Sequence, residues 1–305
     1  MAPSAKKSAA PKPAGGTRAT PAGRYRYHAP KGTTRRPVWI IPVILGALVV
    51  VLLVYMSRRN AGSQSATPAV TAAVVQALTG LPASLFDTAG APPANTSGVW
   101  PTVIPAADRI SGAPQFLYMG AEYCPFCAAE RWVIASTLSR FGTLKGLQLI
   151  TSTPNDIYPD TPTLTFLDAT YQSSTLQAQT VEMENEQDQP LQTPTALQNQ
   201  LITKFDAPPY IPSTEPTGSI PFILIGGEYL WTGSQYDPGL LAGMDWSKVT
   251  AAITGGTTLG QTILARANVL TAAICAVNGA QPASVCGSPG VAAAAQLLPK
   301  GTANG

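Results

Sequence analysis

The 305 residues suffice for one or two domains, and the net charge of +3 hides a strong asymmetry. Residues 1–37 contain nine Lys or Arg and no acid, whereas the chain after Asn60 contains eight Lys or Arg and all sixteen acids, a net charge of −8. The only histidine, His28, lies in the basic segment, so residues 60–305 have no imidazole for a Ser-His-Asp triad or a zinc enzyme. The basic segment gives no reason to expect nucleic-acid binding by the folded part.

An apolar segment follows the basic one. Val38 to Met56 holds 19 residues without a charge, and about 20 apolar residues span the hydrocarbon core of a bilayer. We expect one transmembrane helix at 38–56; the alternative is a cleaved signal peptide, whose apolar core is usually about 7–15 residues long. The excess of Lys and Arg before this helix predicts a single-pass protein of the cell membrane, with a disordered cytoplasmic tail at 1–37 and an extracytoplasmic C-terminal part.

The remainder divides into a polar linker at 57–69, an α/β domain at 70–290 and a flexible tail at 291–305. Thr67 is a candidate N-cap for a helix that opens the domain, since apolar residues follow it with helical spacing.

A strand, a helix and a second strand are predicted next. Gln115–Met119 is apolar and extended, Cys124 to Phe141 places apolar residues on one helical face, and Leu147–Ser152 is again extended. Two strands joined by a helix usually pair in parallel through a right-handed crossover, so we expect these strands to be neighbours.

Residues 155–215 are less regular. Thr163–Tyr171 and Ser174–Glu182 predict either a hairpin or an irregular insertion, and Thr195–Phe205 predicts a short helix. An acidic cluster lies between the second of these extended segments and the predicted short helix. We expect it to be a solvated loop, and the alternative is a cation site. The cluster consists of Glu182, Glu184, Glu186 and Asp188.

The C-terminal part predicts two strands, Ser219–Ile225 and Glu228–Trp231, joined by a Gly-Gly turn. Two helices are predicted after them, at Asp245–Ile253 and Leu259–Ala276.

The motif with recognisable chemistry is Cys124-Pro125-Phe126-Cys127, at the predicted start of a helix. Thiol–disulfide exchange needs an accessible thiolate and a second thiol within bonding reach. At a helix N-terminus, unpaired N–H groups and the helix dipole stabilise a thiolate. We therefore expect Cys124 to attack a partner and Cys127, one turn on, to resolve the mixed disulfide.

Other uses of a CxxC pair fit less well. A zinc ribbon needs a second CxxC, but ten residues separate Cys275 from Cys286, and Ala128 stands where a haem-attachment motif has His. A purely structural Cys124–Cys127 disulfide stays open. We expect neither a metal nor a cofactor.

Charged residues flank the motif. Glu122 could shuttle protons or raise the thiol pKa, but we expect a solvated carboxylate. Glu130 and Arg131 are expected to be exposed, and Trp132 to pack in the core.

All four cysteines follow the apolar segment, and an even number in an oxidising compartment indicates two disulfides. Cys275 and Cys286 enclose a turn-rich loop, so we expect a structural disulfide worth about 2–3 kcal/mol. The alternative is a second redox pair that relays electrons to Cys124 and Cys127.

The dipeptide Ile220-Pro221 opens the strand SIPFILIGGEYLW, and together with the CxxC motif it resembles the thioredoxin superfamily. The resemblance implies that Pro221 is cis and faces the cysteines, and that Ile220 offers backbone hydrogen bonds to a bound polypeptide. Because Cys124 and Pro221 are 97 positions apart, more than in a minimal thioredoxin, it also implies an insertion at about 155–215.

The stretches FLYMGAEYCPFCAAERW, GSIPFILIGGEY and CAVNGAQPASVC also resemble a family of prokaryotic membrane-anchored proteins, domain-of-unknown-function family 929. We expect an α/β, thioredoxin-like fold and a thiol–disulfide oxidoreductase that acts on extracytoplasmic protein thiols or disulfides with an unidentified redox partner. The alternative is a non-catalytic binding module or accessory subunit of a membrane complex. The sequence does not distinguish an oxidase from a reductase or an isomerase.

Overall fold

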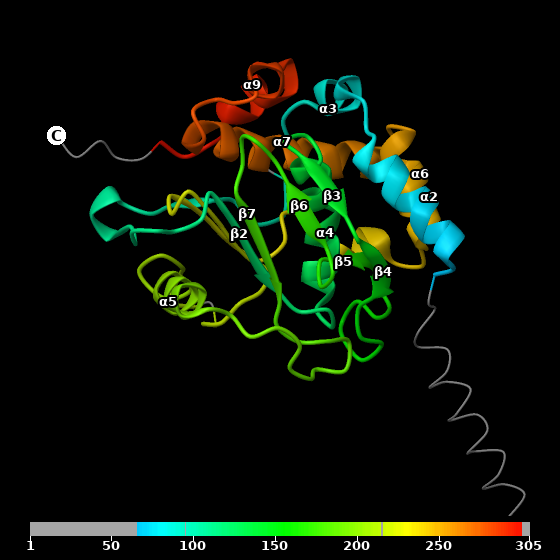
Figure 1. Ribbon diagram of the computed structural model, residues 1–305, viewed down its shortest axis with the longest axis horizontal. Coiled ribbons are helices and arrows are strands. Elements are labelled where there is room, and N and C mark those ends of the chain that lie inside the picture. Colours follow the sequence, from blue (N-terminus) through cyan, green and yellow to red (C-terminus); the bar gives the residue numbers. More distant parts are fainter. Residues whose placement is uncertain (1–65, 95, 215, 301–305) are drawn as a thin grey trace, which may run out of the picture. The chain divides into compact units, whose positions relative to one another are not determined.

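The computed structural model describes residues 66–94, 96–214 and 216–300, which form a mixed α/β arrangement (Figure 1). The predicted cytoplasmic tail and transmembrane helix lie outside the described residues. The helices are α2 (Pro68–Thr79), α3 (Ala83–Ala89), α4 (Pro125–Leu138), α5 (Ala196–Phe205), α6 (Trp246–Thr254), α7 (Thr258–Val277), α8 (Ala283–Cys286) and α9 (Pro289–Ala295), with the short 3-10 helices η1 (Ala106–Asp108) and η2 (Pro238–Leu241). The strands are β1 (Thr102–Val103), β2 (Phe116–Gly120), β3 (Thr143–Lys145), β4 (Gln148–Thr151), β5 (Pro162–Thr165), β6 (Thr170–Gln172), β7 (Ala178–Glu182), β8 (Phe222–Ile225) and β9 (Tyr229–Thr232).

The largest sheet among the described residues has the strand order β1-β9-β8-β2-β7. Its strand β2 is parallel to β7 and antiparallel to β8. The β8–β9 hairpin is the one predicted from the sequence, with Gly226 and Gly227 at positive φ in its turn. The CxxC motif follows β2 after the short turn 121–123, so it lies near one end of a strand that has neighbours on both sides.

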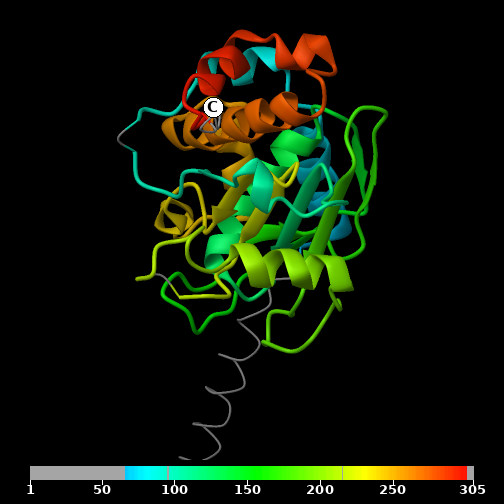
Figure 2. The ribbon, with the colours of Figure 1, turned by 90° about the vertical axis from the view of Figure 1, so that its left-hand side faces the viewer.

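Helices cover both faces of this sheet. Along β2, Phe116 and Tyr118 join a core cluster with residues of α4 and α7, whereas Leu117 and Met119 join a second cluster with residues of α5. Figure 1 shows β2 and β7 between α4 and α5, and Figure 2 shows the orange α7 and the yellow-green α5 on opposite sides of the strands. Burial on both faces explains why β2 and β8 are continuous apolar runs.

One predicted strand pairing is wrong. β4, within the predicted Leu147–Ser152, pairs antiparallel with β5 in a separate two-stranded sheet and does not pair with β2. Leu149 is buried but Gln148 is exposed, so β4 buries one face only. The parallel neighbour of β2 is β7, which comes later in the chain.

The segment predicted as an insertion, 155–215, contains β5, β6, β7 and α5. Of these, β7 joins the five-stranded sheet, whereas β5 and β6 belong to the two-stranded sheets. The possible hairpin between Thr163–Tyr171 and Ser174–Glu182 does not form, because β6 pairs with β3 and β7 pairs with β2.

Several helix boundaries follow from capping residues. Thr67 caps α2 as predicted, accepting a hydrogen bond from the N–H of Val70. Thr195 and Gln198 form a capping box at the start of α5, in which each side chain accepts from the other residue's backbone N–H. The predicted helices at the C-terminal end are α6 and α7.

Within the described residues, α7 is long and apolar enough to span a membrane. Helices α2 and α3 would also be long and apolar enough if they formed one span, although they are bent by 68° relative to each other. Buried residues make up 78% of the apolar window of α7, which packs against α3, α4, α6 and α9. Its apolar character is therefore accounted for by the core of the domain.

Candidate redox site

The turn between β2 and α4 positions the two cysteines. Cys124 is the N-cap of α4 and Pro125 is its first residue, where a missing N–H leaves no helical acceptor unsatisfied. The backbone N–H of Cys127 donates a hydrogen bond to Cys124 Sγ over 3.2 Å. The Cys124 sulfur thus occupies the helix N-terminus, as the sequence predicts.

Both thiols are unbonded and buried. Cys124 is 5% exposed and Cys127 is fully buried, in a small cluster with Ala121, Tyr123 and Ile220. The Cys124 sulfur was expected to be accessible, but it is covered. The segment before β8 lies against it and contributes to its burial.

That segment contains Ile220 and Pro221, joined by a cis peptide bond. Cys124 Sγ lies 3.8 Å from the carbonyl oxygen of Ile220, although 96 positions separate the two residues. The structure therefore agrees with the predicted cis geometry and with the predicted position of this dipeptide against the cysteines.

The two thiols differ in acidity. A hydrogen bond from the Cys127 thiol lowers the pKa of Cys124; the N–H of Cys127 and the positive charge of Arg131 act in the same direction, and burial opposes them. Burial raises the pKa of Cys127 well above the usual value, and the neighbouring Cys124 raises it further. This difference favours Cys124 as the thiolate of the pair.

A buried ion pair lies behind the cysteines and corrects two predictions. Arg131 and Glu182 were expected on the surface, but both side chains are 0% exposed. Arg131 Nε and Nη2 donate to the two carboxylate oxygens of Glu182 over 2.9 and 2.6 Å, and Nη2 also donates to the carbonyl of Ala121 over 2.7 Å. The pair links α4 to β7, so the burial of each charge depends on the other.

Two buried donors near Cys127 have no acceptor among the described residues: the Tyr118 hydroxyl and Arg131 Nη1. A Cβ at Gly120 would overlap the Tyr118 hydroxyl and would lie 3.1 Å from Cys127 Sγ, so the hydroxyl and the sulfur meet at a space that only glycine leaves open. Arg131 follows Cys127 by one helical turn on the same face. Leaving a buried donor unsatisfied costs about 1–3 kcal/mol. The Tyr118 hydroxyl and Arg131 Nη1 are therefore costly to the folded state as long as they have no acceptor.

Glu122 and Glu130 are also more buried than predicted. Glu122 is 7% exposed and accepts a 2.6 Å hydrogen bond from the Thr165 hydroxyl, and burial raises its pKa. Glu130 is fully buried and accepts from the backbone N–H and the Nε2 of Gln235, and burial raises its pKa to about 7. Trp132 is a buried core residue, as predicted.

The rest of the acidic cluster stays near the surface, with Glu184 and Glu186 half-buried and Asp188 exposed. Among the residues that the structure describes, no group of three His, Cys, Asp or Glu is arranged to hold a metal ion. The cation-site alternative therefore has no donor set within this part of the chain.

The second cysteine pair is bonded. Cys275 near the end of α7 and Cys286 at the end of α8 form a disulfide with a Cα–Cα distance of 5.6 Å. This is the pairing expected from the sequence.

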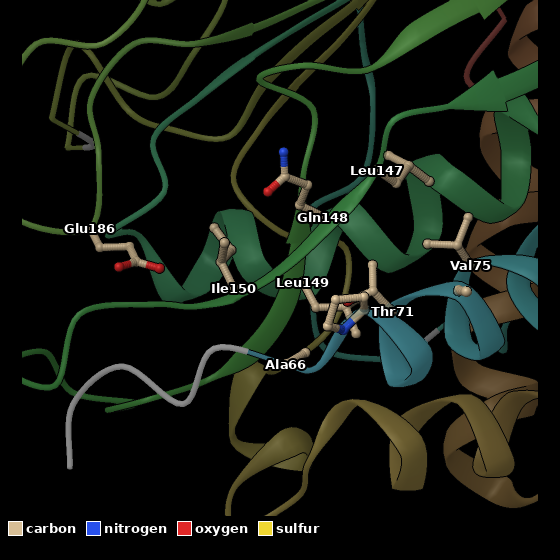
Figure 3. Close-up of a pocket in the computed structure, with 10 residues that line it drawn as sticks. Ala66, Thr71, Val75, Leu147, Gln148, Leu149, Ile150 and Glu186 are labelled. Carbon is tan, nitrogen blue, oxygen red and sulfur yellow. The ribbon is translucent and has the colours of Figure 1, made fainter. Parts of the chain in front are cut away.

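A separate surface pocket of about 610 Å³ lies between α2 and β4. Figure 3 shows Thr71 and Val75 of α2 facing Leu149 of β4 and Leu147 just before that strand, with Glu186 at the far end. No cysteine lines this pocket, so it is not part of the candidate redox site.

The family described as a domain of unknown function (DUF929) matches residues 107–276. The chain belongs to this family. The matched region includes Cys124, Cys127, Pro221 and Cys275 and ends before Cys286. No curated protein and no solved structure matches the chain.

Two side chains beside the cysteines were not predicted from the sequence, namely Tyr118 and the buried Arg131. Arg131 lies four residues after Cys127, which places both on the same helical face, but this spacing does not show that the charge is buried. Tyr118 gave no such indication, because an aromatic residue in a buried strand is ordinary core composition.

Proposed function

We propose that this protein is a thiol–disulfide oxidoreductase with a thioredoxin-like fold that acts on protein thiols or disulfides outside the membrane. The proposal rests on one observation: Cys124 occupies the N-terminus of α4, accepts the N–H of Cys127, and lies against the cis Ile220-Pro221 segment. The strand–CxxC–helix unit and the proline facing it support the resemblance to the thioredoxin superfamily.

The exchange conserves atoms and electrons. The Cys124 thiolate attacks one sulfur of a partner disulfide, forms a mixed disulfide, and displaces the other sulfur as a thiolate that takes up a proton. The Cys127 sulfur, once deprotonated, attacks Cys124 Sγ and releases the second partner sulfur. Two electrons pass from the CxxC pair to the partner disulfide; the reverse sequence oxidises a partner dithiol.

The resolving step needs a thiolate at the fully buried Cys127. Burial makes that charge costly, and the Tyr118 hydroxyl, a donor without an acceptor beside the Cys127 sulfur, offsets part of this cost. Arg131 lowers the pKa of both thiols by its charge. In the proposed enzyme, the Tyr118 hydroxyl gains an acceptor when Cys127 ionises.

Two features support an extracytoplasmic, membrane-anchored location. The apolar segment at 38–56 follows a basic segment. The Cys275–Cys286 disulfide is typical of proteins in oxidising compartments. Protease added to intact spheroplasts should digest residues 60–305 and spare the cytoplasmic tail; protection of residues 60–305 contradicts this topology.

The second candidate function is a non-catalytic binding module or accessory subunit of a membrane complex. The 5% exposure of Cys124 favours it, because a thiol covered by its own chain is poorly placed to meet a partner. Under this alternative the CxxC pair serves the structure only.

A trapping experiment separates the two. In a Cys127→Ala chain the Cys124 thiolate can attack but cannot be released, so mixed disulfides with extracytoplasmic proteins should accumulate. They should disappear on reduction and in the Cys124→Ala/Cys127→Ala control. The reduced wild-type chain should also exchange with hydroxyethyl disulfide, a small uncharged substrate. Absence of both trapped partners and exchange contradicts the enzyme and favours the binding module.

A further inference from the structure

Three large hydrophobic side chains are exposed among the described residues: Phe126 (38%), Ile157 (72%) and Leu240 (50%). They come from three different segments, namely the first turn of α4, the loop 152–161 and η2. Contacts of the loop 152–161 and of η2 hold these residues near the CxxC motif.

The loop 152–161 is attached to the CxxC turn. The backbone N–H of Thr153 donates to the carbonyl of Tyr123, the residue before Cys124, over 3.0 Å. The Tyr158 ring contacts the Phe126 ring edge to face, with centroids 5.9 Å apart. Ile157 is therefore held one residue from a ring that touches the motif itself.

The same tyrosine connects η2. A Cβ at Gly239 would lie 3.0 Å from Cε1 of Tyr158, and Leu240 is the next residue. The Asp237 carboxylate, one turn before Leu240, raises the pKa of the Tyr158 hydroxyl by its hydrogen bond. Phe126 contacts the Tyr158 ring, Ile157 precedes Tyr158 in the chain, and Leu240 follows the glycine beside that ring; we call these four residues the apolar surface.

The loops around this surface are acidic. The segments 152–161, 183–192 and 233–241 contain six carboxylates and no Lys or Arg. The segment 183–192 contacts the turn that precedes the motif, since the N–H of Glu122 donates to the carbonyl of Glu184 over 2.8 Å. The six residues are Asp156, Asp160, Glu184, Glu186, Asp188 and Asp237.

We propose that the apolar surface and its acidic border select the substrate: a cysteine-containing segment with an apolar side chain next to the cysteine and Lys or Arg around it. This inference rests on the proposed exchange function and specifies its substrate class. An apolar neighbour buries Ile157 and Leu240 when the partner sulfur meets Cys124. Six carboxylates without a cation in the same loops attract a basic segment and repel an acidic one.

The test uses the reduced full-length chain in detergent and three peptides with a central cysteine that bears a 5-thio-2-nitrobenzoate leaving group. One peptide has Phe beside the cysteine and Lys outside it; in the second, Glu replaces Lys; in the third, Ser replaces Phe. Attack by Cys124 forms the mixed disulfide with the peptide and releases the coloured thiolate. Each rate is divided by the rate of exchange with hydroxyethyl disulfide.

The Lys-Phe peptide should react about tenfold faster than the Glu-Phe peptide at low salt, and the ratio should narrow in high salt because exposed charges are screened over about 10 Å at 0.1 M. It should also react several-fold faster than the Lys-Ser peptide, and Ile157→Ser should reduce that difference. Asp156→Lys should reduce the Lys-to-Glu ratio, whereas the matched control Asp168→Lys, at an acid outside the three loops, should leave it unchanged.

The outcomes distinguish the proposed substrate preference from the proposed oxidoreductase function. Exchange with hydroxyethyl disulfide but equal rates for the three peptides overturns the selection and leaves the oxidoreductase intact. Equal effects of Asp156→Lys and Asp168→Lys also overturn it, because the preference would then follow net charge alone. Failure to exchange with hydroxyethyl disulfide overturns the oxidoreductase itself.

Discussion

The two cysteine pairs of this domain differ in almost every physical respect. Cys124 and Cys127 are unbonded and buried at the N-terminus of α4, with Glu130 and Arg131 on the same helix. Cys275 and Cys286 are bonded and half-buried, and no charged residue lies between them.

This difference supports the different tasks that we propose for the two pairs. A helix N-terminus and a buried cation stabilise a thiolate, so they favour exchange. A pair without charges that closes a loop constrains the unfolded chain, so it favours stability. The proposed difference between the two pairs is wrong if the charge of Arg131 does not affect the acidity of Cys124, or if the Cys275–Cys286 disulfide affects thiol–disulfide exchange.

The largest expected effect comes from Arg131. Arg131→Met leaves the buried Glu182 carboxylate without its partner, and breaking a buried ion pair costs about 3–5 kcal/mol. It also removes a charge that lowers the pKa of Cys124, so that pKa should rise. Urea unfolding measures the first effect, and the pH dependence of alkylation by iodoacetamide measures the second.

A double variant separates the two effects. Arg131→Met/Glu182→Leu replaces both charges with apolar groups, which often restores stability. The Cys124 pKa should nevertheless stay raised, because the guanidinium is still missing. An unchanged thiol pKa in this folded double variant contradicts the assignment of Arg131 to the redox site and leaves it a structural role.

The next effect concerns pH. Burial raises the folded-state pKa of Glu130 to about 7, above an unfolded-state value of about 4.3. Between these values the folded state binds more protons than the unfolded state, so stability should fall as pH rises from about 4 to 7, by about 3 kcal/mol in total. Urea unfolding from pH 4.5 to 8 should show this slope.

Glu130→Gln should flatten the slope, because an amide does not titrate. The two chains are compared by how their free energy of unfolding changes with pH, and not by its absolute value. The introduced amide would place an N–H against the donors of Gln235, which lowers stability at every pH. Glu184→Gln, at a half-buried carboxylate, serves as the control and should leave the slope of the wild-type chain. An unchanged slope in Glu130→Gln contradicts the assignment of this titration to α4.

Local features of the fold were predictable from sequence, and long-range ones were not. Thr67 and the Gly226-Gly227 turn act within a few residues, so capping and turn rules located them. The parallel partner of β2 is separated from it by β3 to β6, and the apolar pattern of β4 resembles that of a sheet strand. A pattern records how much of a strand is buried, but not which strand lies beside it.

The candidate site divides in the same way. The CxxC spacing and Pro221 were visible because each is a local motif. The burial of Arg131 was not visible, because it depends on Glu182, 51 positions away on a strand whose place in the sheet was itself mispredicted. The burial of Arg131 depends on this partner, and single-sequence patterns do not show which residue it is.

The smallest expected effect tests the other side of the comparison. Cys275→Ala/Cys286→Ala opens a loop between positions 11 apart, and the loss of closure entropy should lower the free energy of unfolding by about 2–3 kcal/mol. Exchange with hydroxyethyl disulfide should keep its wild-type rate, because the bonded pair lies outside the CxxC cluster. The Cys124→Ala/Cys127→Ala chain is the matched control: it keeps the cross-link and should lose exchange. If the Cys275→Ala/Cys286→Ala chain stays folded but exchanges slowly, then the second pair passes electrons to the first, and its disulfide is a redox intermediate instead of a structural link.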